Sequence, residues 1–430
     1  MTDASRRQIL KRAVNLAAIV ALAFDPPLAA SAREQSAPRA DTARKIDALL
    51  RAAVEAGDLP GVVAMAADDS GPIYEGTFGI RRAPDGEPMT RDTIFRVASM
   101  IKPITTVAAL QLVERGKLFL DAPVPAIEPT LGAPRVLDGF DEHERPRLRP
   151  AKRPILLREL LTHTSGFAYR LWDAKAVQYG QALARIPAKE RKDLPPTPLM
   201  FDPGERWQYG GGIDWVGRLV EYASGEPLDA YFRRHIFDPL GMRDTAFVIT
   251  AAQQAREAGG HRRMPDASLM AEPRERLAVP HRPLSGGGGI YSTAPDYLTF
   301  IRTLLHSGVN DSARILRPET VALMGRNQIG KLEAGRMRTT APQFSNDVDF
   351  FPGISLKWGF GHMINMQAGP DGRSAGSLTW GGLLNTYYWI DPSRRLAAVF
   401  MTQILPFADG RTLRIYRQFE RGIYAAVRAG

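Results

Sequence analysis

The chain has 430 residues, of which 44% are hydrophobic, 24% charged and 8% aromatic. This length corresponds to about two to three domains. The composition is that of a globular protein, which excludes a mainly disordered, collagen-like or coiled-coil chain. The sequence contains no cysteine, so a disulfide framework, a thiolate metal cluster and a cysteine nucleophile are excluded. Any covalent catalysis must use another residue.

The first residues have the pattern of an export signal. Ser5-Arg6-Arg7-Gln8-Ile9-Leu10-Lys11 resembles a twin-arginine motif, and it precedes an apolar run from Ala13 to Phe24 and the small residues Ala30-Ser31-Ala32. The apolar run is shorter than the roughly 20 residues that span a bilayer. We therefore predict a signal at residues 1–32, cleavage after Ala32, a periplasmic or secreted protein, and no stable membrane insertion after cleavage.

The formal net charge is +10. The signal holds four basic and two acidic residues, so its removal leaves +8. The densest basic segment runs from Arg145 to Arg158, and no aromatic residues that could stack on bases interleave with it. We predict a solvated, proline-stiffened surface segment there, and no nucleic-acid partner.

Helical spacing and apolar runs bounded by turn residues predict the secondary structure. In chain order, the predicted elements are a helix at 41–56, a hairpin of 61–66 and 73–78 around Asp69-Ser70-Gly71, a buried helix at 104–113, short helices at 155–161 and 214–223, a helix at 295–306, strand-like runs at 356–364, 377–380, 386–390 and 397–402, and an amphipathic helix at about 411–427. Strand signals are sparse between residues 123 and 284. This order predicts one α/β domain, residues 33–125 and 285–430, interrupted by a mainly helical inserted domain at 126–284.

A serine and a lysine stand three residues apart at the head of the buried helix, in Ser99-Met100-Ile101-Lys102. Residues i and i+3 share a face of a helix, so a serine in the first turn would hold its hydroxyl beside the lysine amine. Lysine can take the serine proton only as a neutral amine, which apolar surroundings favour. The helix N-terminus also directs backbone N–H groups toward a developing oxyanion. The alternative is a helix-capping serine beside a surface lysine.

Two further segments complete a recognisable set. Trp207-Gln208-Tyr209-Gly210-Gly211 places a tyrosine before glycines, and Trp380-Gly381-Gly382-Leu383 ends a predicted strand with glycines that allow close backbone approach. With Ser99-Met100-Ile101-Lys102, they resemble the signature boxes of the serine β-lactamase and penicillin-binding-protein superfamily. The match is to its carboxylesterase branch, the family VIII esterases, whose boxes read Ser-x-x-Lys, Tyr-x-x and Trp-x-Gly. The segments at 116–124, 160–166 and 289–297 also look like landmarks of this family.

The resemblance implies a β-lactamase/transpeptidase-like fold, with an antiparallel sheet flanked by helices. It implies that Ser99 attacks the substrate carbonyl, while Lys102 and Tyr209 share its proton and later activate water. The other implied positions are the oxyanion-hole N–H groups of Ser99 and Leu383, and the substrate-binding residues Trp380, Gly381 and Gly382. The alternative for Tyr209 and Trp380 is that of ordinary core aromatics. The sequence shows no cofactor motif and no metal-binding motif.

Two departures from the lactamase pattern bear on the substrate. Lactamases usually have an asparagine two residues after the tyrosine and a lysine at the head of the third box, where this chain has Gly211 and Trp380. Replacing that lysine by an indole removes roughly 1.5–3 kcal/mol of charge-assisted binding to a substrate carboxylate. We therefore expect poor binding of anionic β-lactams, and hydrolysis of a small-molecule carboxylic ester with a small or medium acyl group.

A second serine motif, Gly372-Arg373-Ser374-Ala375-Gly376, matches the nucleophile elbow of α/β-hydrolases. That elbow needs a preceding strand, a following helix and a later histidine. All seven histidines precede Ser374: His143, His163, His235, His261, His281, His306 and His362. We interpret the motif as a loop without catalytic function.

Other functions on the same scaffold remain open at this point. They are β-lactamase or D-amino-acid peptidase activity, acyl transfer to an alcohol or amine, and binding of peptidoglycan or an acyl group without turnover. The presence of Ser99, Lys102 and Tyr209 together favours an enzyme.

Overall fold

The computed structural model describes residues 28–84, 86–192, 194–273, 283–311 and 313–428, with side chains from residue 40. Its centre is a seven-stranded sheet in the order β11-β12-β13-β14-β15-β1-β2, antiparallel throughout. Both ends of the chain build it, as the sequence predicts. The strands are β1 (Gly61–Asp68), β2 (Gly71–Gly79), β11 (Leu356–Trp358), β12 (Met363–Asn365), β13 (Leu378–Gly382), β14 (Thr386–Asp391) and β15 (Leu396–Met401).

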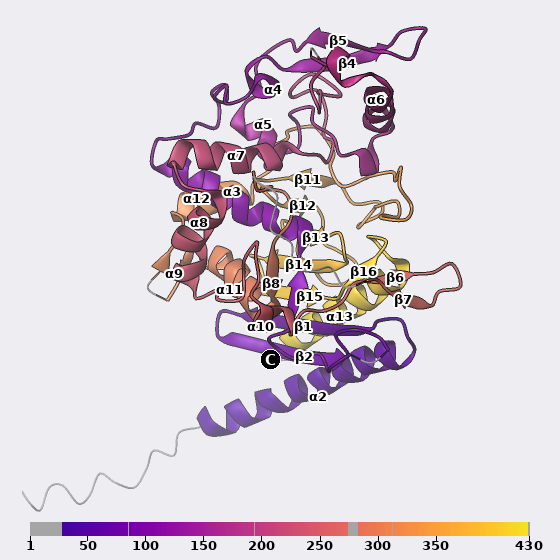
Figure 1. Ribbon diagram of the computed structural model, residues 1–430. Helices are drawn as coiled ribbons and strands as arrows, with labels where there is room; N and C mark the ends of the chain where they lie inside the picture. The colour runs from indigo at the N-terminus through magenta and orange to yellow at the C-terminus, as the bar shows by residue number, and fades with distance from the viewer. Residues whose placement is uncertain (1–27, 85, 193, 274–282, 312, 429–430) are drawn as a thin grey trace, which may run out of the picture.

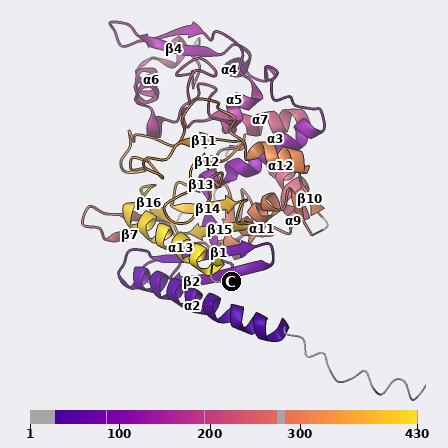
Figure 2. The same ribbon diagram turned by 180° about the vertical axis from the view of Figure 1, so that it is seen from behind.

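Helices cover both faces of the sheet (Figures 1 and 2). On one face lie α13 (Gly410–Arg428) and, packed on it, α2 (Leu28–Glu55); on the other lies α11 (Ala294–Leu305). Successive side chains of strand β14 point to opposite faces of the sheet, so its run of aromatic residues places a ring on each face. The Trp389 ring lies 5.8 Å from the Tyr416 ring of α13, and the next side chain back, Tyr388, lies 5.4 Å from Tyr297 of α11.

Helix α3 (Ile101–Glu114) carries the segment on which the site depends. Every residue from Ile101 to Leu112 is buried, so this helix has no polar stripe along most of its length. It packs against α7 (Gly212–Ser224), which belongs to the middle of the chain. A 3-10 turn, η1 (Ala98–Met100), leads into α3. The predicted buried helix is therefore confirmed, and it begins three residues earlier than the periodicity predicts.

The remaining elements are short. They are β3 (Ile94–Arg96), α4 (Pro129–Gly132), β4 (Arg135–Phe140), β5 (Pro146–Pro150), α5 (Leu157–Leu161), η2 (Arg170–Trp172), α6 (Ala174–Arg185), η3 (Ala188–Glu190), α8 (Leu228–Phe232), η4 (Arg233–Phe237), α9 (Asp238–Leu240), α10 (Ala251–Gln254), β6 (His261–Arg263), β7 (Leu269–Ala271), β8 (Tyr291–Thr293), β9 (Val309–Asn310), β10 (Ala313–Arg314), α12 (Pro318–Met324) and β16 (Ile404–Leu405).

The structure corrects one predicted strand and adds a strand that the sequence did not predict. The run 356–364 is two strands, because Gly359 and Gly361 form a turn in which the Gly359 N–H donates to the His362 carbonyl at 2.8 Å. The basic segment 145–158 contains strand β5, paired antiparallel with β4, although arginine and proline give it no apolar alternation. Pro146 and Pro150 stand at the ends of β5, where a missing N–H disturbs the ladder least.

The export signal lies mostly outside the described residues, which begin at Leu28. Helix α2 starts there, well before the predicted start at Asp41, so the predicted cleavage point after Ala32 falls within its range. Export therefore stays a prediction. Within the part of the chain that the structure describes, no helix combines the length and apolarity needed to span a membrane.

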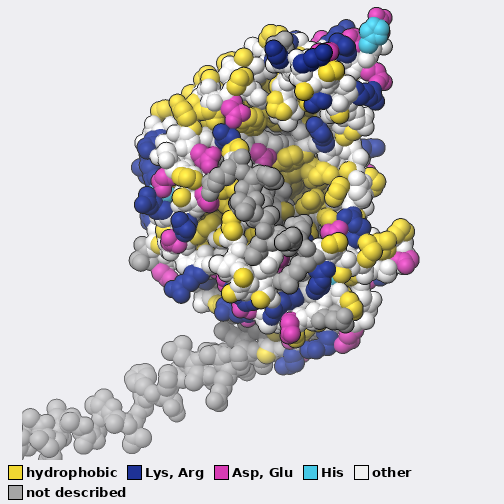
Figure 3. Space-filling model, in the orientation of Figure 1, with side chains coloured by type: hydrophobic (Ala, Val, Ile, Leu, Met, Phe, Trp, Pro, Cys, Tyr) yellow, Lys and Arg dark blue, Asp and Glu magenta, His cyan; other side chains and the backbone are white. Residues whose placement is uncertain are grey.

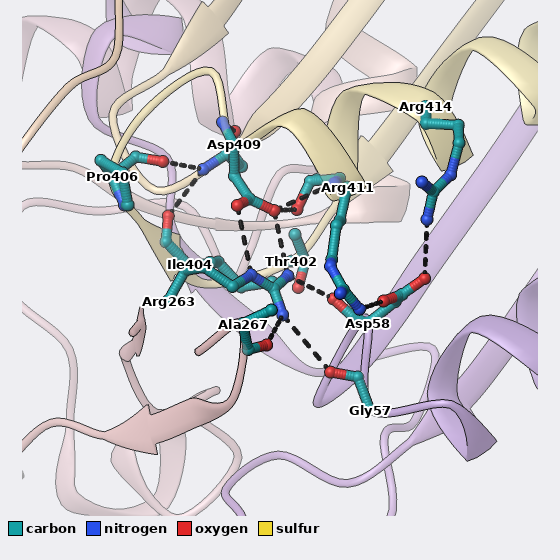
Figure 4. A network of polar contacts seen from close by, with 12 residues as sticks. Gly57, Asp58, Arg263, Ala267, Thr402, Ile404, Pro406, Asp409, Arg411 and Arg414 are labelled. Carbon is teal, nitrogen blue, oxygen red and sulfur yellow. Dashed lines mark hydrogen bonds and ion pairs between the residues drawn. The ribbon is translucent and has the colours of Figure 1, made fainter. Parts of the chain in front are cut away.

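A buried ion pair joins β6 to the start of α13 (Figure 4). The Arg263 and Asp409 side chains are 8% and 6% exposed, with Nη2 and Oδ2 3.0 Å apart. Asp409 also accepts a hydrogen bond from the Thr412 N–H at 3.0 Å, which caps the helix. Burial alone would raise the pKa of Asp409, but these hydrogen bonds and the guanidinium charge hold that pKa below its ordinary value. This ion pair therefore links β6, in the middle of the chain, to the C-terminal helix α13.

Two buried histidines predict acid sensitivity. Burial lowers the pKa of His362 to about 3 and the pKa of His163 well below the ordinary value of 6.5. Between these values and pH 6.5, the unfolded chain binds more protons than the folded chain. The contribution of each neutral histidine to the free energy of unfolding is therefore fully present above pH 6.5, and below it the free energy of unfolding falls by about 1.4 kcal/mol per pH unit for each histidine. We expect urea unfolding to show this fall between pH 6.5 and 5.

The variant His362→Asn isolates one of these contributions. Its amide can replace the contact of His362 Nδ1 with the Tyr388 hydroxyl, which is 2.8 Å long, but the amide does not titrate. The variant should lose stability less steeply between pH 6.5 and 5 than the wild type. Identical slopes would show that His362 does not stay neutral in the folded protein.

Candidate active site

Ser99 and Lys102 meet at the start of the buried helix. Ser99 lies half-buried in η1, and the side chain of Lys102 is completely buried. Lys102 Nζ hydrogen-bonds Ser99 Oγ at 3.0 Å, so the predicted contact is present. Ser99 stands in the 3-10 turn before α3 rather than in the first turn of the helix. Ala98, just before it, has φ +43°, a strained conformation of the kind that concentrates at functional sites.

Tyr209 reaches the same point from the loop before α7. Its side chain is 1% exposed, and Lys102 Nζ lies 4.9 Å from the centre of its ring. The Tyr209 hydroxyl accepts a hydrogen bond from the Trp380 indole N–H at 3.0 Å. The three segments that the sequence singled out therefore converge, although more than 170 residues separate Trp380 from Tyr209 and yet more separate it from Ser99.

Trp380 has a contact that the sequence did not predict. We expected its ring to offer an apolar surface to the substrate, but the residue is only 2% exposed. Its ring lies 4.8 Å from those of Tyr209 and Trp358, and its N–H is directed at the Tyr209 oxygen. The indole thus stabilises negative charge on the Tyr209 oxygen whenever that hydroxyl gives up its proton.

The end of strand β13 packs against the backbone just before Ser99. A Cβ placed on Gly382 would lie 2.3 Å from the Val97 carbonyl oxygen, so only glycine fits. This is the close backbone approach that the sequence predicted. Leu383 follows directly, and its predicted role in the oxyanion hole with the Ser99 N–H stays a prediction, as does substrate contact by Gly381.

Lys102 has several neighbours that its sequence context does not predict. The Tyr169 ring lies 5.3 Å from Lys102 Nζ, and its hydroxyl donates to the Asp214 carboxylate. Burial raises the pKa of Tyr169 well above its ordinary value, and the Asp214 charge adds to this rise. Tyr169 therefore keeps its proton at neutral pH. Lys102 Nζ also donates to the Gly287 carbonyl at 2.8 Å.

His163 packs against Tyr209. Its ring lies 4.6 Å from the Tyr209 ring, and its Nδ1 accepts from the Gly210 N–H at 3.4 Å. Burial lowers the pKa of His163 well below its ordinary value, so it is a neutral acceptor at pH 7. This histidine lies in segment 160–166, which looks like a family landmark, but the sequence does not reveal its contact with Tyr209.

Ser374 lies in a loop between two strands, β12 and β13, so no helix follows it. Its N–H donates to Asp391 Oδ2 at 2.9 Å. The preceding residue, Arg373, forms a buried ion pair with Glu420. This arrangement is that of a structural loop, and the interpretation of the second serine motif as non-catalytic agrees with it.

The variant Trp380→Phe tests the indole N–H. It keeps an apolar ring but removes the hydrogen bond to the Tyr209 oxygen, which is worth about 1.5–3 kcal/mol for a charged partner. For an ester substrate, we expect kcat to fall by about 10- to 150-fold. Trp358→Phe is the matched control, because the Trp358 N–H is buried without a hydrogen-bond partner among the described residues. Equal losses in the two variants would contradict a role for the N–H.

The face of the molecule shown in Figure 3 is hollowed, and hydrophobic side chains line the wall of the hollow. It lies between the layer that holds α5, α6 and α7 and the level of β13 (Figure 1).

The fold and the meeting of Ser-x-x-Lys with a tyrosine are those of the serine β-lactamase and penicillin-binding-protein superfamily. A model of the Beta-lactamase family matches residues 46–422. The chain belongs to this family.

Relatives of similar length include enzymes of acyl transfer and of ester cleavage. The chain is 33% identical over 420 residues to a monacolin J acid methylbutanoyltransferase of Aspergillus terreus, covering 92% of this chain and 98% of the relative. It is also 33% identical over 396 residues to a lovastatin esterase of Penicillium rubens, covering 88% and 98%.

Solved structures agree with the fold. A mutant of simvastatin synthase (LovD) from Aspergillus terreus superposes with a TM-score of 0.78 at 33% identity, covering 91% of this chain and 98% of that one. EstCE1, described as a hydrolase with promiscuous acyltransferase activity, has a TM-score of 0.67 at 24% identity and covers 90% and 99%. The likeness to EstCE1 concerns the fold alone. The comparisons therefore establish a family of serine hydrolases and acyltransferases.

Proposed function

We propose that the protein cleaves carboxylic esters through an acyl-enzyme on Ser99. The observation that carries this proposal is the 3.0 Å hydrogen bond between Ser99 Oγ and the completely buried amine of Lys102. A serine hydroxyl is a weak nucleophile unless an adjacent base takes its proton. No other serine in the sequence has a lysine three residues further on.

The proposed reaction has two halves. Ser99 Oγ attacks the ester carbonyl carbon while its proton passes to the neutral amine of Lys102. The oxyanion faces the N–H groups of Ser99 and Leu383, and its collapse breaks the bond to the alcohol. The leaving alcohol takes up the proton through Lys102 and Tyr209. A water molecule then gives a proton to the same pair and attacks the acyl carbon. Collapse of this second intermediate breaks the bond between the acyl carbon and Ser99 Oγ, and the pair returns the proton to Ser99 Oγ as the acid leaves.

The substrate class follows from the third box. Trp380 stands where a lysine would bind a substrate carboxylate, so the site lacks that charged hydrogen bond. A neutral ester with a small or medium acyl group fits such a site better than an anionic β-lactam.

Transfer of the acyl group to an alcohol is the second candidate. The two relatives at 33% identity are named for a methylbutanoyl transfer and for an esterase activity, respectively. Both reactions can share one acyl-enzyme and differ only in the acceptor, which is water or an alcohol.

Short-chain p-nitrophenyl esters test both candidates. We expect release of p-nitrophenol, with the free acid as product in buffer. If transfer also occurs, a new ester will appear when an alcohol is added. No release by well-folded protein, with any acyl length up to octanoyl, would contradict ester cleavage.

We also propose export through the twin-arginine route, on the strength of the N-terminal motif alone. N-terminal sequencing of the protein from a bacterial host's periplasm should give a start at Arg33. A full-length chain confined to the cytoplasm would contradict export.

A further inference from the structure

The proposed mechanism needs the amine of Lys102 to be oriented as well as neutral. A neutral amine has one lone pair, which must point at the Ser99 hydroxyl proton. A lysine amine sits on a flexible four-carbon stem, so the residue does not fix this direction by itself. The second polar contact of Lys102 Nζ, to the Gly287 carbonyl at 2.8 Å, holds one N–H and thereby directs the lone pair.

The Gly287 peptide is itself held by a chain of hydrogen bonds. Its N–H donates to Ser285 Oγ at 3.0 Å, and Ser285 Oγ donates to Asp214 Oδ1. The preceding carbonyl, of Gly286, accepts from Thr105 Oγ1 of α3 at 2.7 Å. A Cβ on Gly286 would lie 2.4 Å from the Ile213 carbonyl of α7, so this strip of backbone is packed tightly between the two helices.

The same carboxylate also holds Tyr169. The Tyr169 hydroxyl donates to Asp214 Oδ2, and its ring lies 5.3 Å from Lys102 Nζ. A Cβ on Gly287 would lie 2.7 Å from the Tyr169 hydroxyl and 2.8 Å from the Asp214 carboxylate, so the peptide and this pair are in close contact. Asp214 stands in the first turn of α7, where the helix dipole stabilises a carboxylate.

We propose that Asp214 is a positioning residue that orients Lys102 through Ser285 and Tyr169. It fixes both the Gly287 carbonyl and the Tyr169 ring beside the amine. Asp214 has no contact with the reacting atoms in this account. The inference rests on the proposed function of Ser99 and Lys102, and it adds three side chains to the machinery.

Steady-state kinetics of Asp214→Asn, Ser285→Ala and Tyr169→Phe test the proposal on a p-nitrophenyl ester. Misdirection of the amine should lower kcat by about 10²-fold in Asp214→Asn with KM unchanged. Because the three residues act in one chain, Asp214→Asn should add little to the double variant Ser285→Ala/Tyr169→Phe. Full additivity, or a rise in KM with kcat unchanged, would overturn the proposal.

Asp296→Asn is the matched control. Asp296 also stands in the first turn of a helix, α11, and accepts from a hydroxyl, Thr245 Oγ1, at 2.8 Å. Its loss should lower stability as much as Asp214→Asn does without the fall in kcat. An equal fall in kcat would show that the effect is general loosening of the fold.

A crystal structure of Ser285→Ala gives a readout that does not depend on activity. We expect Lys102 Nζ to move beyond 3.5 Å from the Gly287 carbonyl, the usual limit of a hydrogen bond. An unchanged separation would overturn the proposal even if the wild type is an esterase. Conversely, if the wild type has no esterase activity, the proposed function fails, while this displacement would still confirm that the chain from Asp214 positions the amine.

Discussion

Ser99→Ala is expected to lower kcat for a short-chain p-nitrophenyl ester by about 10⁴- to 10⁶-fold. The substitution removes the oxygen that forms the acyl-enzyme, and Lys102 then has no hydroxyl to deprotonate. The loss should appear in kcat with little change in stability, because Ser99 is half-buried and alanine fits its place. Initial rates at saturating substrate measure it.

Ser374→Ala is the control for that experiment. Ser374 belongs to the second serine motif, but it lies in a loop between two strands and its backbone N–H, not its hydroxyl, bonds Asp391. We expect its kcat to equal that of the wild type. A Ser99→Ala enzyme of undiminished activity would rule out the proposed nucleophile, and a large loss in Ser374→Ala would point to the other motif.

Glu420→Ala is expected to destabilise the protein by about 3–5 kcal/mol. Arg373 and Glu420 are 1% and 3% exposed, and they form two hydrogen bonds of 2.8 and 2.7 Å. Removing the carboxylate leaves a guanidinium that is buried under the sheet without a counter-charge. Urea unfolding at pH 7 measures the change.

An ion pair between the exposed Arg414 of the same helix and the buried Asp58 gives the comparison. Arg414, which is 59% exposed, contacts Asp58 at 2.9 Å (Figure 4). Water screens the exposed Arg414, and Asp58 keeps a second partner, Arg411, when Arg414 is removed. Arg414→Ala should therefore change the unfolding free energy by less than about 1 kcal/mol. Similar losses in Glu420→Ala and Arg414→Ala would contradict the role assigned to burial.

The sequence predicts the sheet well where its strands are buried. The runs at 377–380, 386–390 and 397–402 became β13, β14 and β15, because continuous apolar residues bounded by turns leave few alternatives. Strand β5 escaped prediction because its arginines and prolines bury no face. Such a ribbon is stabilised by its partner strand, β4, and by contacts to helix α6, which local sequence does not reveal.

The site shows the same division. The spacing of Ser99 and Lys102 follows from helix geometry, and the boxes around Tyr209 and Trp380 are recognisable by resemblance. Asp214 and Ser285 lie 71 residues apart, and no periodicity links them. The run Gly286-Gly287-Gly288-Gly289 was the available signal, since such a run permits close backbone packing, but it did not reveal that a carbonyl would face Lys102.

Mass spectrometry of the protein after reaction with a fluorophosphonate tests the central claim most directly. The reagent phosphonylates an activated serine, so the modified residue identifies the nucleophile without assuming a substrate. We predict a single adduct, on Ser99, that is absent from Ser99→Ala. An adduct on Ser374 or another residue, or no adduct on well-folded protein, would contradict the account.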